Sequence, residues 1–314
     1  MNSNQSLISF ATGGLDNDIK IWNPINGNIL HSYHNQESQI NALEFTSDGR
    51  ALAAAGFGKI KIYDYHFGSS AVASISASSK NINTIGFNNE RGWMFAGGED
   101  RTAYLIDWKS SLVTKSLDCS SPINTMILHE NQEDIIIGLD NGKILVWNVK
   151  LDKVVNYFFP DPLGGPIYSL ALNSDSTSLA SINSAGNLMV WSISLQDSVN
   201  FTDRHRSKVH SSYGLKVKFS PDDTLIATCG ADGYFNLLKS ANLSSVFRTQ
   251  ATNGKNYWVW DCAFSADSRF LLTASSDSLA RLWNLDNCEE KITYKGHKKS
   301  ITCMAFLDKS MEEI

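Results

Sequence analysis

The sequence predicts an all-β fold in which seven antiparallel blades form a ring, the architecture of a β-propeller. The position that ends an apolar strand recurs seven times, at Trp22, Tyr63, Ile106, Trp147, Trp191, Leu238 and Trp283. The spacings between successive positions are 41, 43, 41, 44, 47 and 45 residues, which is the length of four short strands with their turns. Turn dipeptides such as Asn141-Gly142 separate the strands, and no helical periodicity is sustained.

Each repeat predicts a first strand that ends in Phe or Leu, a second strand that runs into small residues, and a third strand that ends at the recurrent position. In the last full repeat we expect strands over Trp258 to Phe264, Phe270 to Ala274 and Leu279 to Trp283. The least regular segment runs from Ser194 to Ser212 and contains the charge cluster from Asp203 to Lys208. We interpret this segment as a solvated loop that lengthens one outer strand.

The two ends of the chain are out of phase with the repeat. The N-terminal end begins with a second strand, Leu7 to Thr12, and the C-terminal end finishes with an unpaired first strand, Ile301 to Leu307. Joining them completes a blade and removes exposed sheet edges. We therefore predict a closing blade that is shared between the N- and C-termini.

Composition and charge fit one domain that acts through other proteins. The chain has 314 residues, of which 42% are hydrophobic and 19% charged, and the repeats fill nearly all of it, so we expect a single monomeric domain over residues 1–314. A net charge of -5 provides no basic field for nucleic acid or an anionic membrane. The apolar runs are of strand length, Met1 to Ser6 are polar, and the five cysteines are odd in number without a CxxC pair. We expect a cytosolic or nuclear protein, most simply cytoplasmic, with no membrane insertion.

One polar set is assembled from both ends of the chain. In the predicted closing blade, Thr12, Asp16, Trp22 and His297 supply a hydroxyl, a carboxylate, an indole and an imidazole. Buried polar groups are tolerated when they satisfy one another, so we predict a structural hydrogen-bond network. The alternative is a nucleophile of the catalytic-triad type, but Thr12 is followed by two glycines at a strand end, which is not the setting of an exposed hydroxyl beside an oxyanion hole.

The remaining motifs do not indicate an enzyme. Two other repeats contain part of the polar set: Thr273 and Asp277 before Trp283, and His210, Thr228 and Asp232 before Leu238. A phosphate-binding glycine loop, HExxH, paired His/Cys spacing and GxSxG do not occur, and the seven histidines lie in different predicted turns. We therefore expect no catalytic residues, no metal and no cofactor.

Alignment of the first strands identifies residues at the mouth of the central channel. The strands are aligned on a closing apolar residue, called the anchor here: Phe45, Phe87, Leu128, Leu172, Phe219, Phe264 and Phe306. Five places before the anchor the residue is almost always Ile or Val, which marks a buried position. Because side chains alternate along a strand, the residues six and four places before the anchor are expected at the channel mouth. They are Gln39 and Asn41, Asn81 and Asn83, Pro122 and Asn124, Pro166 and Tyr168, Tyr213 and Leu215, Trp258 and Trp260, and Ser300 and Thr302.

These mouth residues form two arcs. The aromatic arc consists of Tyr168, Tyr213, Trp258 and Trp260, on three consecutive repeats. The amide arc includes Gln39 and Asn81. Exposed Tyr and Trp side chains are frequent anchors of protein interfaces, so we predict that both arcs bind a partner protein. The alternative is that the tryptophans fill the channel or pack between blades; we favour the interface for Trp258 and the packing role for Trp260, which lies deeper along its strand.

Longer motifs are specific to one family. They are Ser38 to Glu44, Ala53 to Gly56, Lys80 to Ile82, Trp93-Met94, Gly97 to Asp100, Phe219 to Asp222, Ala227 to Cys229, and Ser275 to Asp277 with Leu279 to Trp283. In these motifs, and from about Ile8 to Leu307, the chain resembles a family of WD-repeat proteins, the small propeller subunits of the TOR kinase complexes. It departs from the WD pattern at Ile106 and Leu238, where Trp is expected.

The resemblance implies a WD40 β-propeller without chemistry of its own. Such a subunit would bind and stabilise the kinase domain of the TOR serine/threonine kinase in both TOR complexes, TORC1 and TORC2, and would act in growth and nutrient signalling. A ubiquitin-ligase substrate receptor is one alternative, but the expected Arg is absent after Trp147 and Trp283. A G-protein β-like signalling scaffold is another, but it should begin with a long helix where this sequence predicts a strand.

Overall fold

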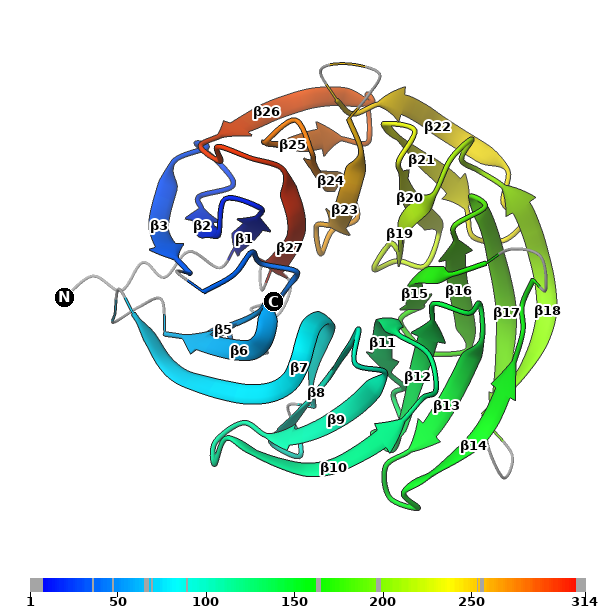
Figure 1. Ribbon diagram of the computed structural model, residues 1–314. Helices are drawn as coiled ribbons and strands as arrows, with labels where there is room; N and C mark the ends of the chain where they lie inside the picture. Colours follow the sequence, from blue (N-terminus) through cyan, green and yellow to red (C-terminus); the bar gives the residue numbers. More distant parts are fainter. Residues whose placement is uncertain are drawn as a thin grey trace.

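The computed structural model describes residues 8–35, 37–46, 48–64, 68, 70–88, 90–161, 165–195, 199–252, 254 and 257–308. In this part of the chain every regular element is a β-strand, which confirms the all-β prediction. Figure 1 shows the sheets arranged in a ring, with the inner strands β7, β11, β15, β19, β23 and β27 around its centre. The described residues contain no helix long and apolar enough to cross a membrane.

Five sheets in the described part of the chain have four strands each. The first consists of β27 (Ile301–Asp308), β1 (Ile8–Gly14), β2 (Asp18–Trp22) and β3 (Ile29–His34). The second consists of β11 (Ile123–Leu128), β12 (Asp134–Leu139), β13 (Ile144–Asn148) and β14 (Lys153–Phe158), and the third of β15 (Ile167–Leu172), β16 (Ser178–Asn183), β17 (Asn187–Leu195) and β18 (Val199–Lys208). The fourth consists of β19 (Gly214–Phe219), β20 (Leu225–Gly230), β21 (Tyr234–Lys239) and β22 (Ser245–Gln250), and the fifth of β23 (Val259–Phe264), β24 (Phe270–Ser275), β25 (Leu279–Asn284) and β26 (Glu289–Lys295).

The remaining sheet has seven strands because two blades share one of them. It consists of β4 (Ala42–Phe45), β5 (Leu52–Ala55), β6 (Phe57–Tyr63), β7 (Ala71–Asn88), β8 (Trp93–Gly98), β9 (Thr102–Asp107) and β10 (Leu112–Asp118). The first half of β7 pairs mainly with β6, and the second half pairs with β8. β7 is therefore the outer strand of one blade and the inner strand of the next, and counting it in both blades gives seven four-stranded units along the described chain.

The two ends of the chain complete one blade, as the phase of the repeats predicts. β27 pairs antiparallel with β1, from Asp308 opposite Ile8 to Ile301 opposite Gly14. Aromatic packing supports this closure, because Phe10, Trp22 and Tyr294 are all completely buried and in ring contact. Exposed sheet edges promote association between chains, and the shared blade leaves none at this point of the ring.

The recurrent strand-ending position is a packing position between blades. All seven of its residues are at most 6% exposed. Trp22 packs in one apolar cluster with Leu272 and Ala280 of the neighbouring blade, and Trp283 packs with Phe235 in the same way. Large side chains that fill the space between sheets explain why this position recurs with the blade period.

The segment around the cluster from Asp203 to Lys208 is a regular strand, so its prediction as a solvated loop is wrong. β18 pairs with β17 from Val199 opposite Leu195 to Lys208 opposite Asn187, and residues 196–198 lie outside the described residues. From Arg204 to Lys208, exposed and half-buried side chains alternate. Charged side chains are common on outermost strands, where they discourage pairing with other chains, and here they concealed the strand period.

Candidate partner-binding face and central channel

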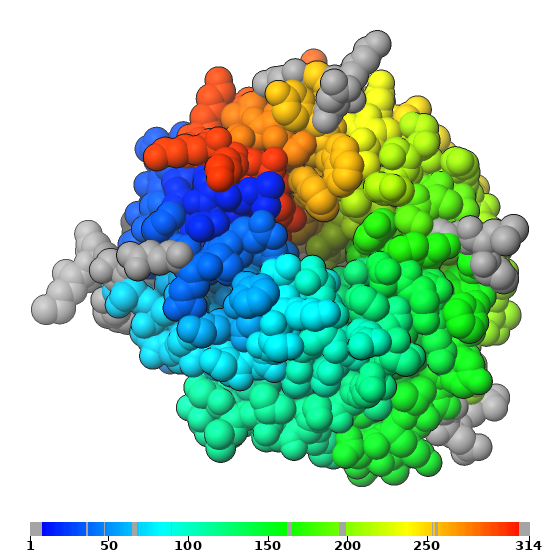
Figure 2. All heavy atoms as spheres, viewed as in Figure 1, coloured from blue at the N-terminus to red at the C-terminus, as the bar shows by residue number. Residues whose placement is uncertain are grey.

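A channel follows the inner strands at the centre of the ring. Its cavity has a volume of about 990 Å3, and Figure 2 shows a hollow in this face of the molecule where the blades meet. Residues near the start of the inner strands, such as Tyr213 and Trp258, line one end, and the anchors Phe219 and Phe264 line the other. The lining therefore extends along the whole length of the inner strands.

The structure separates the two sets of predicted mouth residues. All the residues four places before the anchor line the channel: Asn41, Asn83, Asn124, Tyr168, Leu215, Trp260 and Thr302. Of those six places before it, all of which the structure describes, Gln39, Tyr213 and Trp258 line the channel and Asn81 lies outside the lining. Pro122, Pro166 and Ser300 also lie outside the lining, so the prediction for this position holds in three of the seven repeats.

The aromatic arc forms a continuous row of rings across three blades. The ring centroids are 6.0 Å apart for Tyr168 and Tyr213, 6.0 Å for Tyr213 and Trp258, and 5.0 Å for Trp258 and Trp260. Tyr213 is 44% exposed, and the other three are partly buried. The Nε1 donor of Trp260 is buried and has no acceptor among the described residues. Rings that pack on one another are held in place before any partner arrives, which lowers the entropy lost on binding.

The amide arc is ordered by a chain of hydrogen bonds. Gln39 Nε2 donates to Asn41 Oδ1 at 3.0 Å, and Asn41 Nδ2 donates to Asn81 Oδ1 at 3.4 Å. Asn81 Nδ2 in turn donates to Glu99 Oε1 at 3.0 Å. Gln39 is exposed and Asn81 half-buried. The chain therefore fixes the direction of each amide, and Asn81 has mainly the role of a link between Asn41 and Glu99.

Charged side chains that the sequence alignment did not identify line the channel below the mouth. They are Glu44 on β4, Lys216 and Lys218 on β19, and Asp261 on β23. Lys216 Nζ lies 3.0 Å from Asp261 Oδ1, and the other carboxylate oxygen accepts the backbone N–H of Met304 at 3.0 Å. Burial lowers the pKa of Lys216, but Asp261 outweighs that effect and raises the pKa above its usual value. Lys216 and Asp261 thus form a satisfied pair that joins adjacent blades.

A β-bulge explains why the charges on β19 and β23 were missed. In β7, β11, β15, β19, β23 and β27 the pairing skips the residue four places before the anchor. One extra residue reverses which of the following side chains face the channel. Lys216 and Lys218 therefore face the channel, although simple alternation assigns them to the opposite face. The signal available in the sequence was a charged residue inside a first strand that is otherwise apolar.

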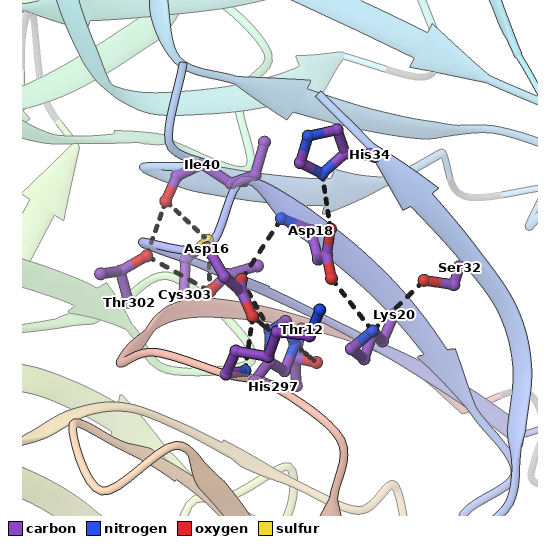
Figure 3. A network of polar contacts seen from close by, with 12 residues as sticks. Thr12, Asp16, Asp18, Lys20, Ser32, His34, Ile40, His297, Thr302 and Cys303 are labelled. Atoms are coloured by element: carbon purple, nitrogen blue, oxygen red, sulfur yellow. Dashed lines mark hydrogen bonds and ion pairs between the residues drawn. The ribbon is translucent and has the colours of Figure 1, made fainter. Parts of the chain in front are cut away.

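The side chains of the closing blade lie in one hydrogen-bonded chain, part of which is shown in Figure 3. Trp22 Nε1 donates to Thr12 Oγ1 at 2.7 Å, and Thr12 Oγ1 lies 2.8 Å from His297 Nε2. His297 Nδ1 lies 3.0 Å from both carboxylate oxygens of Asp16. The network assigns the proton of a neutral imidazole to Nδ1, so that Thr12 donates to Nε2. Thr12 is completely buried, and its hydroxyl is not accessible to a substrate.

Burial and hydrogen bonds act in opposite directions on this network. Burial lowers the pKa of His297, and Asp16 opposes the change without cancelling it. Burial raises the pKa of Asp16, but hydrogen bonds from the backbone N–H of Lys298 and from His297 lower it below its ordinary value. A neutral imidazole beside an ionised carboxylate is therefore the state that the fold favours.

A second network replaces the missing tryptophan with an amide. His210 Nδ1 lies 2.9 Å from Asp232 Oδ1, and His210 Nε2 lies 3.0 Å from Thr228 Oγ1. Asn236 Nδ2 donates to Thr228 Oγ1 at 3.4 Å, in the role that the indole has elsewhere. Burial raises the pKa of Asp232, but the hydrogen bond from His210 outweighs it and lowers the pKa to about 2.

A third network replaces the missing histidine with an arginine. Trp283 Nε1 donates to Thr273 Oγ1 at 2.9 Å, as in the closing blade. The carboxylate of Asp277 is paired instead with Arg281, whose Nη2 lies 2.7 Å away and whose Nη1 donates to the Ala251 oxygen. Arg281 is 2% exposed, so this is a buried ion pair with additional hydrogen bonds. Asn236 and Arg281, the two replacing residues, each lie on the third strand of their blade, two residues before the recurrent position.

The structure is that of a WD-repeat propeller. It has blades of four strands around a channel, a buried residue at the end of each third strand, and hydrogen-bond networks of hydroxyl, imidazole and carboxylate groups. The family described as WD domain, G-beta repeat, matches residues 69–107, 199–237 and 246–284. Two of these segments contain Ile106 and the third strand that precedes Leu238, where tryptophan is missing. The match therefore does not depend on that residue.

Full-length relatives define the particular family. The chain is 36% identical over 316 residues to Target of rapamycin complex subunit LST8 of Mus musculus, covering 96% of this chain and 95% of that protein. It is 38% identical over 314 residues to Protein LST8 homolog of Drosophila melanogaster, covering 98% of each. It is 31% identical over 304 residues to Target of rapamycin complex subunit LST8 of Saccharomyces cerevisiae, covering 96% of this chain and 99% of that protein. The chain belongs to the LST8 family, and the resemblance noted from its motifs is confirmed.

Proposed function

We propose that this protein is a non-catalytic WD40 scaffold subunit of the TOR complexes TORC1 and TORC2, acting in the cytoplasm in growth and nutrient signalling. The observation that carries the proposal is similarity along almost the whole chain to relatives named as target of rapamycin complex subunits in mouse and yeast. These relatives do not favour the ubiquitin-ligase receptor or the G-protein β-like scaffold. A scaffold role also fits the buried hydroxyl of Thr12, because the polar set that resembles a triad has no access to a substrate.

We further propose that the aromatic arc contacts the kinase domain of TOR. Tyr213 and Trp258 support this, because they lie at the channel mouth, pack edge to face on one another and retain exposed ring surface. Aromatic side chains that are partly exposed and already ordered bury much area at small entropic cost. Gln39 supplies an exposed amide at the same mouth, where it can satisfy polar groups of the partner. The geometry suits a helical or extended segment laid across the face.

The test is recovery of TOR kinase from cell lysate with Tyr213→Ala and Trp258→Ala variants. Loss of an interface anchor costs about 2 kcal/mol or more, which weakens binding by roughly thirtyfold. Tyr157→Ala is the matched control, because Tyr157 is 60% exposed on the outer strand β14, away from the mouth. We expect the control to recover as much kinase as the unaltered chain and both mouth variants to recover much less.

Two results would separate the parts of the proposal. If folded Tyr213→Ala and Trp258→Ala proteins recover undiminished kinase, the assignment to the aromatic arc is wrong while the family role stands. If the unaltered chain recovers no TOR kinase, the proposed function itself is wrong. Thermal melts of all variants show whether each one is folded before the recoveries are compared.

A further inference from the structure

We infer that the channel below the mouth binds a small zwitterion, a molecule with an ammonium group at one end and a carboxylate at the other. The inference rests on Glu44 and Lys218, which neither the networks between blades nor the proposed kinase contact uses. It is independent of the proposed function, because it concerns the interior of the channel and the protein without its partner.

Glu44 and Lys218 project into the channel from different blades. Both line the cavity and both are exposed, although the walls of the channel surround them. β4 contacts β27, β27 contacts β23 and β23 contacts β19, so two inner strands separate the carboxylate from the ammonium around the ring. The two charges therefore face each other across the channel rather than along one wall.

Neither charge is neutralised by contact. Within the described residues, the side chains of Glu44 and Lys218 make no hydrogen bond or ion pair, whereas Lys216 Nζ lies 3.0 Å from Asp261 Oδ1. The surrounding walls raise the pKa of Glu44, and Lys218 and then Lys216 act against that rise. The Glu44 side chain is exposed to solvent in the channel, and this hydration also acts against the rise in its pKa.

The channel has room for a ligand at this level. Of the neighbouring positions one place before the anchor, Ala263 and Ala305 line the channel with small side chains, which leaves space where Glu44 and Lys218 extend inward. At Gly86 the ring of Phe95 lies where a Cβ would be. The cavity of about 990 Å3 is within the range of small-molecule sites. Small residues around two opposed charges define a slot that a linear molecule can span.

The balance of charge favours a zwitterion over a simple ion. The channel holds two lysines and two acids, so a lone anion is attracted by Lys218 and repelled by Glu44, and a lone cation meets the reverse. A ligand with both charges satisfies both groups and repels neither. The spacing between its ends should match the gap between Glu44 and Lys218.

The experiment titrates the purified full chain with zwitterions of increasing length, observed by ligand-detected NMR. The probes are glycine, β-alanine, γ-aminobutyrate and ε-aminocaproate, with hexylamine and hexanoate as singly charged controls. We expect one chain length to bind best, and we expect it to bind about tenfold more tightly than either singly charged control. If no member of the series binds, or if hexylamine or hexanoate binds as well as the best zwitterion, the inference is wrong.

Charge variants test the residues. Glu44→Gln and Lys218→Gln should each weaken the best probe by about tenfold, and Lys239→Gln, which changes an exposed lysine on β21, should not. The double variant Glu44→Lys with Lys218→Glu reverses the pair, so binding should return with the ligand turned end to end. Undiminished binding by folded Glu44→Gln and Lys218→Gln variants, or failure of the folded reversed pair to bind, overturns the assignment to these two residues.

Discussion

Removal of the Thr12 hydroxyl tests how strongly the closing blade depends on its polar network. Thr12→Val keeps the shape of the side chain but leaves Trp22 Nε1 without an acceptor and His297 Nε2 without a donor. Trp22 and Thr12 are completely buried, so water cannot replace the lost partners. Each unpaired buried group costs about 1–3 kcal/mol, and the two together give an expected loss of about 2–6 kcal/mol in the free energy of unfolding.

Thr273→Val is the matched control because, among the described residues, the Thr273 hydroxyl has one hydrogen-bond partner, Trp283. Thr273 accepts from Trp283 Nε1 at 2.9 Å, and Arg281 rather than a histidine pairs with the nearby carboxylate. This variant should therefore lose about 1–3 kcal/mol, half of the loss expected for Thr12→Val. Within the described residues, two buried indole donors already lack an acceptor: Trp260 Nε1, and Trp147 Nε1, where Ile137 stands ten residues earlier. Unpaired indoles are thus compatible with the fold.

Urea unfolding followed by circular dichroism and by tryptophan fluorescence measures both variants. The comparison is meaningful where the two signals change together and the slope with urea is the same as for the unaltered chain. We expect the midpoint of Thr12→Val to fall clearly below that of Thr273→Val. Equal midpoints for the two variants would show that the bond between Thr12 and His297 contributes nothing, and the account of ring closure through this network would be refuted.

Three further predictions concern other positions. The stability of the folded protein should fall as pH drops below about 6.5, because the pKa of His297 is lowered in the folded state and the unfolded chain therefore binds the proton first. The melting temperature of His297→Gln should depend less on pH across this range. Asp232→Asn should lower the free energy of unfolding by about 2 kcal/mol at neutral pH, because the pKa of Asp232 is lowered from 3.8 to about 2 in the folded state. This stabilisation is present above pH 3.8 and lost as pH falls toward 2, so urea unfolding should show the difference at pH 7 and not in acid. Gly98→Ala should cost about 2 kcal/mol or more, because the added Cβ overlaps the backbone oxygen of Asn81, while Gly68→Ala, which meets only ordinary contacts, should leave the melting temperature nearly unchanged.

The spacing of one residue type was sufficient to predict the architecture, because the end of each third strand has the same packing role in every blade. Trp22 and Trp283 fill the space between sheets, and Ile106 can do so without an indole. Ring closure followed from the same spacing, since only a shared blade pairs both ends. The fusion of two blades through β7 was not predictable in this way, because continuous pairing depends on the path of the backbone between Ser76 and Ile82 rather than on residue type.

The channel was harder to predict than the mouth because alternation along a strand fails after a bulge. Tyr213 and Trp258 lie before the bulge, and the structure places both on the channel lining as the alignment predicts. Lys216 and Lys218 lie after it, where a rule based on period two assigns the wrong face. A residue that takes the place of another residue type is also hard to predict from sequence. Arg281 takes the place of a histidine, and this is recognised only from its contact with the carboxylate of Asp277.

The strand that two blades share has a mechanical consequence. Within the described residues the ring contains six separate sheets, so it has six joints at which neighbours can shift, and none between the blades that β7 unites. The hydrogen-bonded chain from Gln39 to Glu99 is attached to this double blade at both ends. The seam formed by β27 and β1 lies directly beside it, because β27 also contacts β4. A strained ring would therefore yield at the joints between sheets, and the two blades that β7 unites would move as one rigid wall that carries the amide face as a single body.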